Sequence, residues 1–402
     1  METIKLRKYL GGVEMKKIYA GKKICYLIVV TLLFISSFTY SSANEFSVNA
    51  KSAILIDAGT GKILYENNSH EKLPPASVTK IMTMLLVMEA LENKQITLED
   101  NVTISEHASS MGGSQLYLEP GEIRTVEQLM KGVAIASAND ASVALGEHIS
   151  GSDELFVKRM NERAAQLGMK NTQFMNTNGL PEEGHYTSAF DISLMSRELL
   201  KHPKVHDWLT IWMSSMKVGK KGRSTLELTN TNKLIRFYPG ANGIKTGFTQ
   251  EAKFCLSASA IRNNFTLVSV VMGSPTSKIR FAEARKLLDF GFAAYNSVQI
   301  AQKDEVFDEI TVEKGKLTKV KIVAKEDLKV LVKKGEENNV QKEMIVPKTV
   351  KAPFEKGEKV GEIVVTNSKG ENLGKVDLIT ENSCKKASIF DTLGKMLKNI
   401  AQ

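Results

Sequence analysis

The chain has 402 residues, of which 42% are hydrophobic and 25% charged, with a formal net charge of +9 at pH 7. This is ordinary globular composition, and the length suffices for two domains with a sizeable core, so disorder is not expected. The lysines of the C-terminal third are mixed with acids and lack a stacking-aromatic motif, which argues against nucleic-acid binding.

Residues 1–43 read as an export signal. Lysines precede an apolar run, Ile24 to Phe38, which is followed by Ser41-Ser42-Ala43. The run is about 15 residues long, shorter than the roughly 20 that a permanent spanning helix needs. We therefore expect cleavage after Ala43 and a mature protein outside the cytoplasm, either peripheral on the extracytoplasmic face of the cell membrane or secreted. Translation could start at Met1 or at Met15.

The mature chain opens with a predicted hairpin, Ser52 to Asp57 and Lys62 to Glu66, joined by a Gly-containing turn. From Ser77 to Glu92, apolar residues cover nearly every face of a helical pattern, which predicts a buried helix. Helical periodicity returns between Val126 and about Leu200, with a Gly/Pro-punctuated loop at 176–186.

Strands are expected again after Gly240. Phe254 to Ile261 and Phe265 to Met272 predict a second hairpin, followed by another helix. Hairpins at both ends around helices indicate an α+β domain over residues 44–300. Short Val/Ile/Leu strands separated by Lys/Glu/Gly turns then predict a small β-rich domain over residues 301–382.

The terminal segment, residues 383–402, has the pattern of an amphipathic helix. Its apolar face would hold Ile389, Phe390, Leu393, Met396, Leu397 and Ile400. Such a helix either lies on a membrane surface or packs on its own domain. Because it follows a finished β domain, we expect a peripheral membrane anchor as readily as internal packing.

Ser77 and Lys80 form a Ser-x-x-Lys pair, whose spacing places both side chains on one face of a helix. Lysine can act as the base for a serine nucleophile only when it is neutral, which requires roughly 4 to 5 kcal/mol of differential destabilisation. Burial in an apolar helix supplies part of this, and a second cation such as Lys245 would add roughly 3 kcal/mol at about 5 Å. The start of the helix would also offer backbone N–H groups to an oxyanion.

Two further motifs accompany this pair. Ser137-Ala138-Asn139 lies between two apolar helical runs, at a turn that could project a hydroxyl and an amide into a cleft, although helix capping is the simpler explanation. Lys245-Thr246-Gly247 leads toward the second hairpin, where Lys245 and Thr246 could hold a carboxylate. The order Ser-x-x-Lys, Ser-x-Asn, Lys-Thr-Gly is the signature of penicillin-recognising serine enzymes.

The surrounding residues make the resemblance specific. Pro75 to Thr83, Ser137 to Ala141 and Gly243 to Gly247 resemble the low-molecular-mass D-alanyl-D-alanine carboxypeptidases, the S11 serine peptidases. The resemblance extends through Asn176 to Leu180, and Ala352 to Gly357 is similar to the family's second domain. It implies a penicillin-binding-protein/β-lactamase-like fold, an antiparallel sheet flanked by helices.

The resemblance also implies a reaction and its residues. Ser77 would attack the penultimate D-alanine carbonyl of a peptidoglycan stem peptide, D-alanine would leave, and β-lactams would acylate the same serine. Lys80 would accept the proton, Ser137 and Asn139 would relay protons and hold substrate, and Lys245-Thr246-Gly247 would bind the terminal carboxylate. The backbone N–H groups of Ser77 and Phe248 would form the oxyanion hole. The chain departs from the family pattern at Ala138, often Gly, and at Phe248, histidine in some relatives.

Three other functions remain as alternatives, and two of them would use the same residues. A β-lactamase of class A needs an added glutamate, and the chain has no Glu-x-x-Leu-Asn segment, although Glu182 and Glu183 lie in a loop that could approach the site. A D-alanyl endopeptidase would differ only in the room beyond the scissile bond. A catalytically inactive wall-binding protein would not need every reacting side chain.

No cofactor or metal is expected. Cys25 falls in the signal, and Cys255 and Cys384 lie far apart in the sequence, without metal-ligand spacing. The expected partners are peptidoglycan stem peptides, β-lactams and, through the terminal helix, the membrane surface.

Overall fold

The computed structural model describes residues 46–222 and 224–391. The predicted signal, residues 1–43, and most of the predicted terminal helix lie outside these ranges. Among the residues that the structure describes, no helix has the length and apolarity required to cross a membrane.

The first domain is built on a five-stranded antiparallel sheet with the strand order β2-β1-β9-β8-β7. Its strands are β1 (Ser52–Asp57), β2 (Ile63–Asn67), β7 (Ala241–Thr249), β8 (Lys253–Arg262) and β9 (Phe265–Ser274). Both predicted hairpins are confirmed: β1 pairs with β2, and β8 pairs with β9 through the turn at Asn263-Asn264, where both residues have positive φ.

Helices and short turns fill the chain between the two hairpins, and one long helix follows the second. These elements are η1 (Ala76–Thr79), α2 (Lys80–Glu92), α3 (Glu106–Ser109), α4 (Val126–Lys131), η2 (Gly132–Ala136), α5 (Asn139–Ser150), α6 (Asp153–Gln166), α7 (Ala189–Leu199), η3 (Pro203–Val205), α8 (His206–Leu209), α9 (Leu234–Phe237) and α10 (Ser277–Ala294). The buried helix expected from Ser77 begins as a helix only at Lys80, because Ala76–Thr79 forms a 3₁₀ turn after Pro74-Pro75.

Four further strands appear between the hairpins, so the expectation that strands return only after Gly240 was wrong. They are β3 (Asn101–Thr103), β4 (Ile123–Thr125), β5 (Met213–Val218) and β6 (Ser224–Thr229), paired as two ribbons. The β5–β6 ribbon is mostly exposed and largely polar, so it lacks the apolar alternation that marks a half-buried strand.

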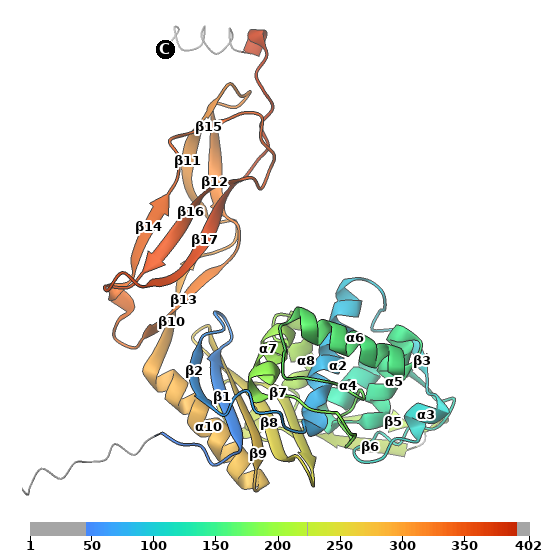
Figure 1. The fold of residues 1–402 in the computed structure, drawn as a ribbon. Helices are drawn as coiled ribbons and strands as arrows, with labels where there is room; N and C mark the ends of the chain where they lie inside the picture. Colours follow the sequence, from blue (N-terminus) through green and yellow to red (C-terminus); the bar gives the residue numbers. More distant parts are fainter. Residues whose placement is uncertain (1–45, 223, 392–402) are drawn as a thin grey trace, which may run out of the picture. The chain divides into compact units, whose positions relative to one another are not determined.

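Helices pack on both faces of the sheet (Figure 1). Alternate residues of a strand point to opposite faces. Leu55 and Leu267 lie on the face that α10 covers, beside Gly291. Their neighbours point to the other face, into the core shared with α2 and α7: Ile54, Ile56, Val268 and Val270. The sheet is therefore the middle layer of the domain. Helix α2 lies in the core on the face opposite α10.

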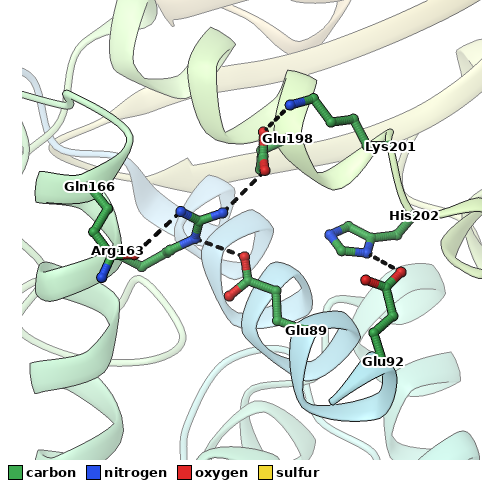
Figure 2. A network of polar contacts seen from close by, with 7 residues as sticks. All are labelled: Glu89, Glu92, Arg163, Gln166, Glu198, Lys201 and His202. Atoms are coloured by element: carbon green, nitrogen blue, oxygen red, sulfur yellow. Dashed lines mark hydrogen bonds and ion pairs between the residues drawn. The ribbon is translucent and has the colours of Figure 1, made fainter. Parts of the chain in front are cut away.

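A network of charges joins the C-terminal half of α2 to α6 and α7 (Figure 2). Arg163 on α6 donates to Glu89 on α2 at 2.7 Å and to Glu198 on α7 at 3.1 Å. Lys201 donates to the other oxygen of Glu198 at 2.6 Å. The end of α2 remote from Lys80 is thus fixed by partly buried ion pairs.

The C-terminal part of the chain is β-rich, as expected. β10 (Tyr295–Ala301) pairs with β13 (Leu328–Lys333), and a six-stranded sheet has the order β14-β16-β17-β12-β11-β15. The remaining elements are β11 (Val306–Glu313), β12 (Lys319–Ala324), η4 (Glu337–Asn339), β14 (Gln341–Ile345), β15 (Thr349–Lys351), β16 (Lys359–Thr366) and β17 (Asn372–Thr380). Its strands enclose their own core, which includes Ile322, Val365 and Leu378. The domain limits at residues 300 and 382 stay predictions.

Candidate active site

Ser77 stands on a tight turn between Pro75 and α2. Ala76, before it, has a φ of +49°, a left-handed conformation that costs a non-glycine residue about 1–3 kcal/mol. Two glycines let other segments approach this turn. A Cβ on Gly247 of β7 would lie 2.9 Å from the Pro75 carbonyl oxygen, and one on Gly179 would lie 1.9 Å from that of Ala76. Both segments can therefore contact the turn only through glycine.

Lys80, the first residue of α2, faces Ser77 as the Ser-x-x-Lys spacing predicts. Its Nζ lies 3.0 Å from the Oγ of Ser77. The same nitrogen donates at 2.6 Å to the side-chain oxygen of Asn139 and at 2.6 Å to the main-chain carbonyl of Asn178. A neutral amine has two N–H groups and one lone pair, so these two acceptors leave the lone pair for the Ser77 hydroxyl.

The surroundings of Lys80 favour that neutral form. The side chain is fully buried. Burial lowers the pKa of Lys80 well below its ordinary value, and the positive charge of Lys245 lowers it further, while Asp140 opposes both. The two causes inferred from the sequence are confirmed, and the opposing carboxylate was not foreseen.

Lys245 lies on β7, as predicted for the Lys-Thr-Gly motif. It is fully buried, and burial together with the charge of Arg280 lowers the pKa of Lys245 to about 7. Arg280 on α10 is itself buried and donates to the carbonyls of Gly247 and Cys255 at 3.0 and 3.1 Å. Two buried basic side chains, Lys245 and Arg280, therefore supply positive charge beside the neutral Lys80, which makes the site attractive to a carboxylate.

Thr246 completes the polar end of the motif. Its hydroxyl donates at 2.8 Å to the hydroxyl of Thr231, a residue without an assigned role in the sequence interpretation. Thr231 is presented by its two buried neighbours: Asn230 donates to two carbonyls of residues 209–211, and Asn232 donates to the Gly243 carbonyl at 2.8 Å. The backbone of Thr231 also donates to Ile135 at 3.2 Å, so it connects β7 to the Ser137 turn.

Ser137 and Ala138 form the predicted turn between η2 and α5. Ser137 has a φ of +65°, and its Oγ is buried without a hydrogen-bond partner among the described residues. Asn139 accepts from Lys80 and donates at 2.6 Å to the Gly112 carbonyl. The motif is thus part of the site, and the capping interpretation is wrong: the N-cap of α5 is Ala138, and no side chain caps the helix there.

Asp140 holds the segment beside this motif. Its carboxylate accepts from the backbone N–H groups of Leu116, Leu118 and Ala141 at 2.8 to 3.1 Å. Burial nevertheless raises the pKa of Asp140. Residues 111–118 are therefore anchored to the start of α5, next to the amide of Asn139.

Phe248 follows Gly247 near the end of β7. Its side chain is 48% exposed and packs against Phe254, with ring centroids 4.4 Å apart. The side chain is thus available to contact a ligand but carries no reacting group. Its backbone N–H follows the residue that contacts the Ser77 turn, as an oxyanion donor would require.

The loop acids considered as β-lactamase groups are directed elsewhere. Glu182 accepts from the side chain of Asn176 at 2.9 Å, and Glu182 and Glu183 are both exposed. They line a surface groove with Lys72 and Glu251. Among the described contacts, neither acid touches Ser77 or Lys80.

Sequence reasoning missed four contributors. They are the Asn178 carbonyl, the Asp140 carboxylate, Thr231 and Arg280. Asn178 and Asp140 fall within segments that carried the family resemblance, and that was their only signal. A main-chain carbonyl has no residue-type signature, and Arg280 reaches β7 from a helix whose pattern alone does not say which strand it covers.

A serine on a strained turn, a buried lysine beside it and a cationic strand edge on an α+β scaffold define a serine acyl-transfer enzyme. Residues 39–276 match the family model described as D-alanyl-D-alanine carboxypeptidase, and residues 295–386 match that of the penicillin-binding protein 5 C-terminal domain. The chain belongs to the D-alanyl-D-alanine carboxypeptidase family, the S11 serine peptidases.

Individual relatives span most of the chain. D-alanyl-D-alanine carboxypeptidase DacF of Bacillus subtilis is 45% identical over 355 residues, which cover 88% of this chain and 90% of the relative. DacC of Escherichia coli is 35% identical, with 79% and 80% covered. The crystal structure of penicillin-binding protein 5 from Haemophilus influenzae, 32% identical, superposes with a TM-score of 0.72 over 85% of this chain and 98% of that one.

Proposed function

We propose that Ser77 is the nucleophile with which this serine-type D-Ala-D-Ala carboxypeptidase removes the terminal D-alanine from peptidoglycan pentapeptides. Membership of the family gives the reaction class, an acyl-enzyme mechanism and acylation by β-lactams. The assignment of roles to residues rests on the geometry around Lys80. The observation that carries it is the 3.0 Å separation of the Lys80 Nζ and the Ser77 Oγ in a fully buried setting.

In the acylation step, the Ser77 hydroxyl donates its proton to the neutral Nζ of Lys80 while its oxygen attacks the penultimate D-alanine carbonyl carbon. The backbone N–H groups of Ser77 and Phe248 stabilise the resulting oxyanion. The C–N bond then breaks, and the proton passes from Lys80 by way of Ser137 to the departing D-alanine amine. The Oγ of Ser137 is buried and makes no hydrogen bond among the described residues, so it is available to pass this proton.

Deacylation reverses the roles. Water attacks the ester carbonyl, Lys80 takes the water proton, and the tetrapeptide leaves as Ser77 recovers its hydrogen. Asn139 holds Lys80 in place throughout, since its side-chain oxygen accepts from Nζ at 2.6 Å.

The terminal carboxylate of the substrate is recognised by Lys245 and Thr246. Lys245, with a pKa lowered to about 7 by burial and Arg280, gains a counter-charge when the carboxylate binds, which favours its protonated form. Gly247 lets the substrate backbone lie along β7 without a side chain in the way.

A direct test compares two activities of the purified mature chain. The first is the number of D-alanine molecules released per enzyme from a pentapeptide ending in D-Ala-D-Ala. The second is the number of β-lactam molecules hydrolysed per enzyme. We expect many D-alanine turnovers and a long-lived β-lactam adduct. Fast repeated β-lactam hydrolysis without D-alanine release would instead identify a β-lactamase.

We also propose that the enzyme is exported and associates with the membrane through residues 383–402. The described beginning of this segment supports the idea, because Ile389 and Phe390 are 78% and 86% exposed. Deletion of residues 387–402 should move the protein out of the membrane fraction while D-alanine release continues. Unchanged partitioning of the deletion variant would refute the anchor.

A further inference from the structure

One histidine outside the three motifs contacts the turn between Ser77 and Lys80. His185 is only 7% exposed, and its Nε2 lies 2.9 Å from the hydroxyl of Thr79, the residue immediately before Lys80. Its other ring nitrogen, Nδ1, accepts from the backbone N–H of Met175 at 3.2 Å. Because a backbone N–H can only donate, Nδ1 carries the lone pair, and the Nε2–H of His185 donates to Thr79.

These two hydrogen bonds bridge the two ends of a loop, beside the backbone pair Gln173–Tyr186 that also joins them. Met175 and His185 stand at the start and end of residues 175–185, and the ring of His185 joins both to Thr79. The ring edge of His185 also packs on Phe174, with centroids 6.0 Å apart. The side chain of His185 is thus one tie between this loop and the nucleophile turn.

The loop carries groups that the reaction centre uses. The carbonyl of Asn178 accepts from the Lys80 Nζ at 2.6 Å, and the carbonyl of Thr177 accepts from Thr83 on α2 at 2.6 Å. Gly179 lies against the carbonyl of Ala76, which precedes Ser77. Any movement of the loop would therefore change the hydrogen bonding of Lys80 and admit water to it.

We propose that His185 is a positioning residue for Lys80: its neutral ring ties residues 175–185 to Thr79 and so holds the Asn178 carbonyl on the base. The inference rests on the proposed role of Lys80 as proton acceptor. No described contact joins His185 to Ser77, and it acts through Thr79 and the loop.

The chemistry of the ring suits this function. Burial lowers the pKa of His185 to about 4, so the ring is neutral at the pH at which Lys80 acts as a base. A second proton on Nδ1 would face the Met175 N–H, donor against donor, and would break the closure. A neutral histidine offers one donor and one acceptor at a fixed separation, which matches the two partners here.

The test uses a matched set of variants on the intact mature chain. Thr79→Val removes the acceptor of the His185 donor, and Thr79→Ser keeps a hydroxyl there. His185→Asn keeps an acceptor near the Nδ1 position but cannot reach Thr79. The rate constant of β-lactam acylation is measured for each as a function of pH, with melting temperatures alongside.

Thr79→Val and His185→Asn should each slow acylation about tenfold or more, because the Asn178 carbonyl is no longer held on Lys80. The acid limb of the pH–rate profile should move to higher pH in both, since water entry weakens the burial that lowers the pKa of Lys80. Thr79→Ser should behave as wild type. The double variant should lose no more than the slower single variant, because both changes break one contact.

The inference would be overturned if folded Thr79→Val and His185→Asn kept the wild-type acylation rate constant and the wild-type acid limb of the pH–rate profile. It would also be overturned if the losses of the two single variants multiplied in the double variant. If His185→Asn does not fold, the Thr79→Val and Thr79→Ser pair decides alone. Failure of the proposed function shows differently: wild-type protein would then not be acylated, or Ser77→Ala would be acylated as well.

Discussion

Lys80 and Lys245 are two fully buried lysine side chains, and the charge of Lys245 holds the pKa of Lys80 further below its ordinary value than burial alone. They reach the site from different layers, Lys80 from helix α2 and Lys245 from strand β7. The pair therefore links the base of the reaction to the residue proposed to bind the substrate carboxylate.

Lys245→Met should impair both the binding of the substrate carboxylate and the function of Lys80 as a base. Acylation by a carboxylate-bearing β-lactam should slow by about 10²-fold, because a buried charge-assisted contact is lost. The acid limb of its pH profile should move to higher pH, since removal of a neighbouring cation raises the pKa of Lys80. Stopped-flow acylation from pH 5 to pH 10 measures both effects. Exposed Lys278→Met is the control, and an unmoved limb in Lys245→Met would contradict the coupling.

The same substitution should stabilise the fold at low pH. The folded-state pKa of Lys245 is lowered from 10.5 to about 7, so between these values the unfolded chain binds more protons and stability rises with pH. The penalty of the buried charge is complete below pH 7 and absent above 10.5. Lys245→Met should therefore gain about 2–4 kcal/mol in urea unfolding at pH 6, and little at pH 10. Equal gains at both pH values would show that the charge is not the cause.

Gly179→Ala should disable the site through the backbone. Gly179 has a φ of +85°, and a Cβ there would lie 1.9 Å from the Ala76 carbonyl oxygen, so the loop or the Ser77 turn must move. Acylation should fall by about 10²-fold or more. Gly184→Ala in the same loop is a matched control: its φ is +83°, but its Cβ would make only ordinary contacts, the nearest with the Met175 sulfur at 3.6 Å. Similar acylation rates in the two variants would refute the close approach.

Arg163→Met should affect stability and leave catalysis alone. Its removal leaves the carboxylates of Glu89 and Glu198 without their shared partner in a partly buried position (Figure 2). The free energy of unfolding should fall by about 1–3 kcal/mol in denaturant titration. Lys158→Met on the same helix, whose pairing with Glu162 is exposed, should stay within about 0.5 kcal/mol of wild type. A larger loss in Lys158→Met than in Arg163→Met would contradict the network's role.

Much of this architecture could be predicted from local pattern. The β1–β2 and β8–β9 hairpins followed from alternation and turn residues, and the Lys80 environment followed from an apolar helix with one cation. Ser77 differed in detail: it lies in a 3₁₀ turn, which Gly179 and Gly247 approach closely from segments distant in sequence.

The rest depends on long-range packing. The contact of Asn178 with Lys80 joins residues 98 positions apart through a main-chain atom, which no residue type announces. The β5–β6 ribbon escaped prediction because its polar, exposed strands resemble loop sequence. His185 sits in a Gly/Pro-punctuated segment that reads as an ordinary surface loop until the ring is seen buried against Thr79.

The central claim is that Ser77 carries the acyl group, and intact-protein mass spectrometry after incubation with a β-lactam tests it most directly. Wild-type protein should gain the mass of one β-lactam in a stable adduct, and peptide mapping should place it on Ser77. Ser77→Ala should gain none. Equal labelling of Ser77→Ala, or an adduct mapped to another residue, would contradict the account.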